Sequence, residues 1–156
     1  MAIEIERKFL VNSIPIKNID ISKRIKQGYI INNKEKTLRI RQSDDDYTIT
    51  IKGKTTGISR LEFEYPIPKK DADIIFKHLC NGHIIKKTRH YVCHKSFTWE
   101  IDEFHDINHG LIVAEIELKH ENEQFELPHW VGKEVTGDLK YNNVNLCTNP
   151  YEQWLI

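Results

Sequence analysis

The chain has 156 residues, of which 39% are hydrophobic and 29% are charged, a composition typical of a globular protein rather than of a disordered or membrane-spanning one. Its 23 basic and 23 acidic side chains cancel, so no general positive field favours binding to nucleic acid or to an anionic membrane. This length fits one domain covering residues 1–156, and any bound anion must be held by a local cluster of basic side chains.

The ends and the cysteines indicate a cellular compartment. The first eight residues carry charges where a signal peptide needs an apolar core, and no window approaches the roughly 20 apolar residues of a membrane-spanning helix. The cysteines Cys80, Cys93 and Cys147 form no C-x-x-C pair, and their odd number does not suit a complete disulfide framework. We therefore expect reduced thiols and a cytoplasmic protein.

Alternation of polar and apolar residues dominates the chain and predicts a mainly β (α+β) fold. The predicted strands, in chain order, cover residues 3–11, 24–31, 37–42, 47–52, 61–68, 87–94, 96–104 and 111–120. Several of the segments between them carry the Asn, Asp, Gly and Ser residues of turns. Short connections of this kind favour antiparallel neighbours.

Two helices are predicted beside these strands. The first covers residues 70–80, between Pro68 and an Asn-Gly pair that ends it, with Ile75 and Leu79 on its apolar face. The second is short and follows Pro150 near the end of the chain. Both are expected to lie at the periphery of the strands.

The charged side chains occur as neighbours of like sign, two residues apart, on one face of most strands. Glu4 and Glu6 share a face with Lys8, opposite apolar residues. The other members of the pattern are Arg39 and Arg41, Glu62 and Glu64, Lys87 and Arg89, Glu100 and Asp102, Glu115 and Glu117, and the single Lys52. An ordinary half-exposed strand also alternates apolar with charged, but a solvated face has no reason to segregate the signs so regularly.

These faces have a chemical use if they converge in the lumen of a barrel of about eight strands, which is wide enough for a small ligand. Carboxylates are the oxygen ligands that Mg²⁺ or Mn²⁺ prefers, and those ions complete their shells with phosphate oxygens. Arginines add forked donors that match phosphate geometry. The pattern therefore favours a site for a metal-bound oligophosphate.

The sequence Glu-Ile-Glu-Arg-Lys at residues 4–8 resembles the E-x-E-x-K signature of the CYTH, or triphosphate tunnel metalloenzyme, superfamily. The likeness extends over nearly the whole chain. It continues through L-R-I-R at 38–41, T-I-K at 50–52, E-F-E at 62–64, K-T-R at 87–89, E-I-D at 100–102, A-E-I-E at 114–117 and E-V-T-G-D-L-K-Y at 134–141. The resemblance implies a closed eight-stranded antiparallel β-barrel tunnel with a few peripheral helices.

The resemblance also implies a role for each charged residue. Glu4, Glu6 and Glu117 would hold a Mg²⁺ or Mn²⁺ ion that bridges the triphosphate, and Asp102 and Glu115 would serve a second ion or its water. Glu62 or Glu64 would orient the attacking water, so that the implied catalytic group is Lys8, Glu62, Glu64 and Asp102. The residues implied to bind phosphate oxygens are Lys8, Arg39, Arg41, Lys52, Lys87, Arg89 and Lys140.

The activity implied is hydrolysis of inorganic triphosphate to diphosphate and orthophosphate. Class IV adenylyl cyclases look similar, but they usually carry a His-Phe pair shortly before the signature, and only three residues precede Glu4 here. Adenylate cyclase and thiamine or nucleoside triphosphatase activities remain alternatives, because they need the same ligands. A non-catalytic polyphosphate-binding module is an alternative of another class, which the retained carboxylates disfavour.

Some side chains keep two interpretations. Tyr29 can touch Lys8 or pack in the core, and Arg60 can reach a phosphate or remain a solvated turn residue. The partner expected is a small-molecule triphosphate, with no nucleic acid and no membrane, and a homodimer is left open. Candidates for a dimer contact, for closing one tunnel end or for anchoring the last helix are Trp130, Tyr151 and Trp154.

Overall fold

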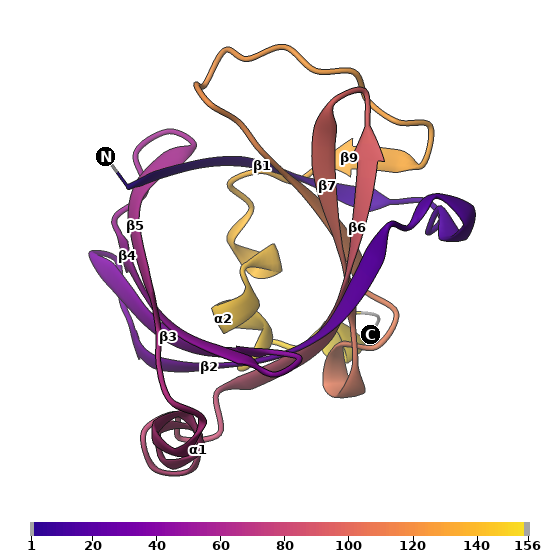
Figure 1. Ribbon diagram of the computed structural model, residues 1–156. Helices are drawn as coiled ribbons and strands as arrows, with labels where there is room; N and C mark the ends of the chain where they lie inside the picture. The colour runs from indigo at the N-terminus through magenta and orange to yellow at the C-terminus, as the bar shows by residue number, and fades with distance from the viewer. Residues whose placement is uncertain (1, 155–156) are drawn as a thin grey trace.

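A computed structural model describes residues 2–154 and shows a β-sheet that closes on itself around a central lumen (Figure 1). Its strands are β1 Ile3–Val11, β2 Ile21–Asn32, β3 Lys36–Ser43, β4 Asp46–Gly53, β5 Ser59–Pro66, β6 Ile84–His94, β7 Phe97–Phe104, β8 Ile112–Glu117 and β9 Val131–Glu134. The α-helices are α1 Lys69–His78 and α2 Asn143–Leu146, and the 3-10 helices are η1 Ile16–Asn18, η2 Asp106–Asn108, η3 Leu139–Tyr141 and η4 Tyr151–Gln153. No helix among these residues is long and apolar enough to cross a membrane.

The strands follow the order β5-β4-β3-β2-β6-β7-β8-β1-β9, and a further pairing between β5 and β1 closes the barrel. Every pairing is antiparallel. The closing strand β1 is shared, because Ile3 to Ile5 pair with β5 while Phe9 and Val11 pair with β9. The predicted eight-stranded antiparallel barrel is therefore confirmed, and β9 is one strand more than the sequence predicts.

The sequence predictions of individual elements hold to within a few residues. All eight predicted strands are present, and the helix predicted over residues 70–80 is α1. The helix predicted after Pro150 is only the single 3-10 turn η4, and the α2 helix was not predicted. Both β9 and α2 have four residues, too few for a periodic pattern to stand out.

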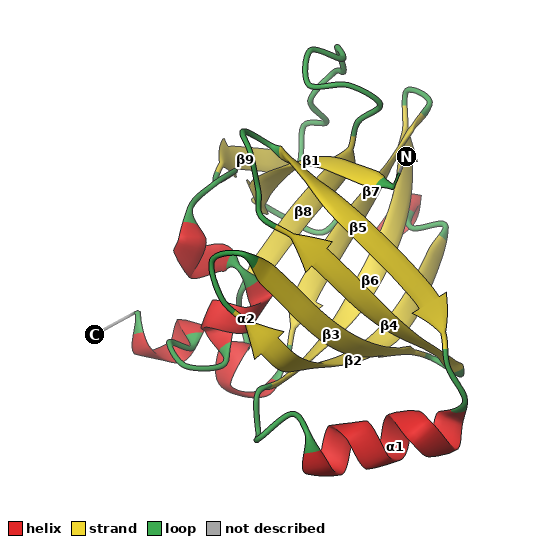
Figure 2. Cartoon of the chain, turned by 90° about the vertical axis from the view of Figure 1, so that its left-hand side faces the viewer, coloured by secondary structure: helices red, strands yellow, loops and turns green. Residues whose placement is uncertain are grey.

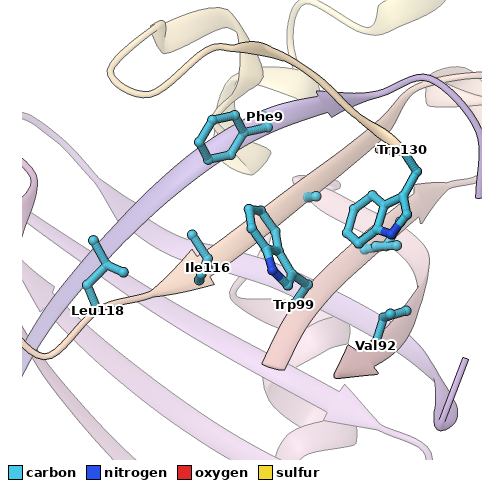
Figure 3. Close-up of a cluster of buried hydrophobic side chains, with 8 residues drawn as sticks. Phe9, Val92, Trp99, Ile116, Leu118 and Trp130 are labelled. Atoms are coloured by element: carbon cyan, nitrogen blue, oxygen red, sulfur yellow. The ribbon is translucent and has the colours of Figure 1, made fainter. Parts of the chain in front are cut away.

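The outward apolar side chains are covered in two sectors of the barrel. Phe125 and Trp130 lie between β8 and β9 and pack over β1, β7 and β8. The rings of Trp99 and Trp130 meet edge to face with their centroids 5.5 Å apart (Figure 3). The α1 helix packs over Ile40 and Tyr47 of β3 and β4. Successive side chains of a strand point to opposite faces of the sheet. Because the apolar side chains lie on the outer face, the polar ones point into the lumen.

A glycine in β2 permits the close approach of α1. A side chain at Gly28 would place its Cβ 2.5 Å from the Sγ atom of Cys80, which follows the end of α1 and is fully buried. Any larger residue would push the end of the helix away from the barrel wall. At one end of the barrel, α2 lies across the ring of strands in the axial view, and Leu146 packs with Tyr29, Phe104 and Tyr141 (Figure 1).

Candidate active site

The lumen holds a cavity of about 230 Å³ whose wall is almost entirely charged or polar. The residues lining it are Glu4, Glu6, Lys8, Gln27, Tyr29, Asn32, Thr37, Arg39, Arg41, Lys52, Arg60, Glu62, Glu64, Lys87, Arg89, Glu100, Glu115, Glu117, Asn142, Asn143 and Val144. All the predicted site residues are in this set except Asp102 and Lys140. Their roles remain predictions, but the barrel brings their side chains to one cavity.

The acidic part of the cavity is formed by the paired strands β1 and β8. Glu6 lies opposite Glu117, and Lys8 lies opposite Glu115. Burial, together with the charges of Glu115 and Glu4, raises the pKa of Glu6 well above its ordinary value. Burial and the neighbouring carboxylates also raise the pKa of Glu117. The neighbouring negative charges disfavour the ionised forms of these two carboxyls, and a bound cation would offset that repulsion.

Two other carboxylates are held in the charged form by basic neighbours. Partial burial of Glu4 opposes its ionisation, but the Nζ atom of Lys52 lies 3.1 Å from its Oε2 and the Nε atom of Arg60 lies 3.2 Å from the same oxygen. These charges lower the pKa of Glu4. Burial acts against ionisation of Glu115 too, but the charges of Lys8 and Arg89 outweigh it and hold the Glu115 pKa well below its ordinary value. The cavity therefore contains carboxyls whose pKa values are shifted in opposite directions.

The basic part of the cavity contains a cation with no acidic partner. The Nε and Nη2 atoms of Arg41 donate only to the neutral side-chain oxygen of Gln27, at 3.1 and 2.9 Å, and no carboxylate of residues 2–154 lies within 4.0 Å of its guanidinium nitrogens. Burial and the nearby charges of Arg39 and Arg89 lower the pKa of Arg41 to about 10. In addition, the buried Nε atom of Arg39 has no hydrogen-bond partner in the described chain. An arginine without an acidic partner, and a buried guanidinium nitrogen without a hydrogen-bond acceptor, both suit an anionic ligand.

The β5 wall contributes the two acidic residues predicted to orient water. Glu62 lies 3.0 Å from the Nζ atom of Lys52. Glu64 accepts a 2.9 Å hydrogen bond from the hydroxyl of Thr50, which in turn accepts one from Arg39. Each carboxylate is therefore fixed beside a basic side chain of the cavity.

Asp102, which the resemblance assigns to a second metal ion or its water, is not among the residues that line the cavity. Its carboxylate is only 1% exposed. One oxygen accepts from Arg89 Nε at 2.7 Å, and the other accepts from Lys87 Nζ at 2.7 Å and from Arg89 Nη2 at 2.9 Å. Burial opposes its ionisation, but the charges of Arg89 and Lys87 lower its pKa. Asp102 thus positions two basic side chains, and both of its oxygens accept hydrogen bonds from them.

Lys140 also departs from prediction. Its side chain is exposed, and its Nζ atom lies 4.7 Å from the centroid of the Trp154 ring and 5.2 Å from that of Tyr141. The ammonium group of Lys140 therefore lies over the rings of Trp154 and Tyr141, whose faces stabilise a cation. The residues of this segment that line the cavity are instead Asn142, Asn143 and Val144.

Several lining residues were not predicted. Gln27 is a buried neutral side chain in β2, and period-two phase alone could have placed it on the inner face. Asn143 accepts hydrogen bonds from Lys87 Nζ at 2.8 Å and from Gln27 Nε2 at 3.1 Å. It lies in the four-residue helix α2, far from β2 and β6 in the sequence, so no local pattern indicates it.

Tyr29 and Arg60, each of which has two interpretations from sequence alone, both line the cavity. Tyr29 accepts a 2.6 Å hydrogen bond from Gln27 Nε2, while its ring packs in the core. Arg60 reaches the cavity and pairs with Glu4. Trp130 is buried inside the outer core and Trp154 packs on Tyr141 and Tyr151, so these aromatic rings anchor the chain to itself.

The donor set fits a hard divalent cation. The available donors at the acidic end are carboxylate oxygens of Glu4, Glu6 and Glu117, which suit Mg²⁺ or Mn²⁺. Within residues 2–154 no three acidic, His or Cys side chains already form a closed ligand cage. Mg²⁺ does not need one, since it commonly binds through one or two carboxylates and completes its shell with water and substrate phosphates.

Comparisons with known proteins agree with this geometry. The family model described as the CYTH domain matches residues 2–151. An inorganic triphosphatase of Acetivibrio thermocellus is 46% identical over 154 residues, which is 99% of each chain, and one of Nitrosomonas europaea is 32% identical over 92% of this chain and 96% of its own. The crystal structure of an inorganic triphosphatase superposes with a TM-score of 0.67 at 30% identity, covering 92% of this chain and 93% of the other.

Proposed function

The chain belongs to the CYTH domain family, and from that premise we propose that it hydrolyses inorganic triphosphate to diphosphate and orthophosphate with a divalent cation. The observation that carries the proposal is the arrangement of charge in one cavity. Arg41 is a half-buried cation without a carboxylate partner among the described residues. Glu6 and Glu117 are carboxyls whose pKa values are raised by burial and by other carboxylates of the cavity, including Glu4. A triphosphate bound with a cation supplies the charge that each of these groups lacks.

The substrate is held through its phosphate oxygens. Arg39, Arg41, Lys87 and Arg89 converge from β3 and β6, and Lys8 and Lys52 extend the basic surface toward the carboxylates. Arginine donors arranged in this way neutralise charge on the transferring phosphoryl group, which is the main source of catalysis in phosphoryl transfer. Asp102 and Asn143 keep Lys87 and Arg89 aimed at the cavity.

Glu4, Glu6 and Glu117 would hold the cation, and the preferred ion is Mg²⁺ or Mn²⁺. When bound, such an ion polarises phosphoryl oxygens and lowers the pKa of a coordinated water. The chain's own contribution to the attack is a base that orients water. Glu64 is the stronger candidate of the β5 pair, because Glu62 is already within 3.0 Å of the Lys52 ammonium, whereas Glu64 is 3.6 Å from its nearest cation, Arg39.

A short, unsubstituted phosphate chain fits the cavity better than a nucleotide does. The volume of about 230 Å³ is small, and among the described lining residues Tyr29 is the one aromatic side chain, with its hydroxyl bonded to Gln27 and its ring packed in the core. No ring face is therefore offered to a purine or to thiamine. Both named relatives are inorganic triphosphatases, which supports the same choice. The cysteines are free, which fits a reducing cytoplasm.

The proposal is tested by measuring orthophosphate release from inorganic triphosphate, ATP and thiamine triphosphate, each with Mg²⁺, with Mn²⁺ and with EDTA. We expect metal-dependent release, fastest from inorganic triphosphate. Formation of cyclic AMP from ATP would assign the chain to the cyclase alternative. Tight binding of triphosphate without turnover would assign it to the phosphate-binding alternative.

A further inference from the structure

One sector of the outer barrel wall is apolar and uncovered. On β5, Arg60, Glu62 and Glu64 line the lumen, so Leu61 and Phe63 between them, and Tyr65 beyond, face outward. Leu61 pairs with Ile3 of β1, and Phe63 pairs with Ile51 of β4. These five side chains, which we call the β5 face, are between 40% and 54% exposed. Figure 2 shows this wall toward the viewer, with α1 below it and no helix across it.

The β5 face differs from the rest of the outer surface in having no cover. The outward residues Ile40 and Tyr47 lie under α1, and Phe9 and Trp99 lie under Phe125 and Trp130. The other exposed large hydrophobic residues of the described chain, such as Ile16 in η1 and Leu127 in the loop after β8, are spread over several elements outside the β5 face. Scattered residues need no explanation, whereas a contiguous apolar wall marks an interaction site.

We propose that the β5 face packs against the same face of a second copy of this chain, in a twofold symmetric homodimer. A twofold contact places a surface against itself, so any charge on it would meet a like charge. The outward positions of the β5 face carry no charge, and the chain as a whole has zero net charge, so self-association meets no electrostatic opposition. A charged partner, by contrast, would find no complementary group on this wall.

The exposed area agrees with what a dimer needs. Exposures of 40% to 54% on five large side chains amount to on the order of 500 Å² of accessible surface. A stable interface buries about 800 Å² on each partner, of which roughly 60% is apolar. At the rim, the exposed pair of Lys54 and Glu35, 3.8 Å apart, supplies the polar border that such interfaces have.

A dimer at this position would brace the closure of the barrel. The β5–β1 pairing joins Ile3, Glu4 and Ile5 to Leu61, Arg60 and Ser59, so Leu61 and Ile3 of the β5 face lie directly on it. Across the same closure Glu4 pairs with Arg60 and Lys52 inside the lumen. Packing on the outer side would therefore hold the strand that carries Glu62 and Glu64 against the strand that carries Glu4 and Glu6.

The test is the molar mass of the full chain in solution, measured by light scattering or sedimentation at about 1 to 100 µM. We expect a species of twice the 18.5 kDa chain mass. Phe63→Lys should raise the dimer dissociation constant by at least about 100-fold, because a charge is buried at the centre of the contact. Ile16→Lys is the matched control, since Ile16 is 78% exposed on another element, and it should remain dimeric.

Tyr65→Lys gives a second variant if Phe63→Lys does not fold, and it should also yield monomers. A wild-type chain that stays monomeric at about 100 µM would overturn the proposal, as would a Phe63→Lys variant that folds and dimerises like wild type. A monomer that cosediments with phosphatidylcholine vesicles would assign the face to a lipid surface and equally overturn the second copy. None of these outcomes depends on the proposed activity, because molar mass is read without substrate.

Discussion

Lys87 and Asn143 are 56 residues apart in the sequence, but the Nζ atom of Lys87 donates a 2.8 Å hydrogen bond to the side-chain oxygen of Asn143. The same oxygen accepts from Gln27, which also receives two donors of Arg41. One amide from the C-terminal segment thus joins the basic residues of β3 and β6. Without a ligand, burial lowers the pKa of Lys87 to about 7 despite the nearby Asp102, so its charge depends on such neighbours.

Replacing Asn143 should weaken substrate binding more than it slows turnover. Asn143→Ala removes the acceptor shared by Lys87 and Gln27, and a hydrogen bond to a charged group contributes about 1.5–3 kcal/mol. We expect KM for triphosphate to rise by roughly 10-fold or more, with a smaller change in kcat. Asn145→Ala is the control, because Asn145 lies in the same helix but bonds only the Leu139 carbonyl. Equal kinetics for the two variants would refute a positioning role.

Arg41 should be essential for activity but unfavourable for stability. Arg41→Ala removes a half-buried cation that has no carboxylate partner and whose pKa is lowered by burial and by Arg39 and Arg89. We therefore expect kcat/KM to fall by about 100-fold or more, while the melting temperature without substrate is unchanged or higher. Arg24→Ala changes an exposed arginine of the neighbouring strand and should leave both quantities near wild type. A large fall in melting temperature for Arg41→Ala would show that the arginine is structural.

The raised pKa of Glu6 gives a pH dependence of stability with a definite sign. Between the ordinary carboxyl pKa of 4.5 and the raised value, the folded chain keeps a proton that the unfolded chain has lost. The free energy of unfolding therefore decreases as pH rises through that window. Glu6→Gln cannot ionise, so in EDTA its melting temperature should exceed that of wild type by an increasing margin as pH rises. Parallel curves for the two proteins would contradict the raised pKa.

Replacing Asp102 distinguishes a structural role of this carboxylate from a metal-binding role. Asp102→Asn leaves Lys87 and Arg89 buried without their shared anion, and breaking a buried pair typically costs about 3–5 kcal/mol. We expect a lower free energy of unfolding in denaturant titrations even in EDTA. Glu117→Gln is the comparison, because it should reduce metal affinity without that loss. If Asp102→Asn keeps wild-type stability and only weakens metal binding, Asp102 is a ligand after all.

The sequence predicts the lumen well because its information is local. Two-residue alternation fixes which face of a strand a side chain occupies, so Glu4, Glu6 and Lys8 share the cavity as expected. How deep a side chain lies along the lumen is not determined by the local sequence, because it depends on the neighbouring strands. Asp102 has the same phase as Glu100, but pairing with Lys87 and Arg89 buries it behind the cavity wall. Lys140 and Asn143 lie in a segment without periodicity, where only tertiary packing decides which side chain enters the barrel.

The proposed function of the cavity is to bind inorganic triphosphate and cleave it into diphosphate and orthophosphate. This is tested by ³¹P nuclear magnetic resonance of the purified protein with inorganic triphosphate and Mg²⁺ or Mn²⁺, alongside Arg41→Ala and an EDTA control. We expect equal amounts of diphosphate and orthophosphate from wild type, and little of either from the variant or in EDTA. Undiminished product with Arg41→Ala, or no product from wild type with either metal, would contradict the proposed function.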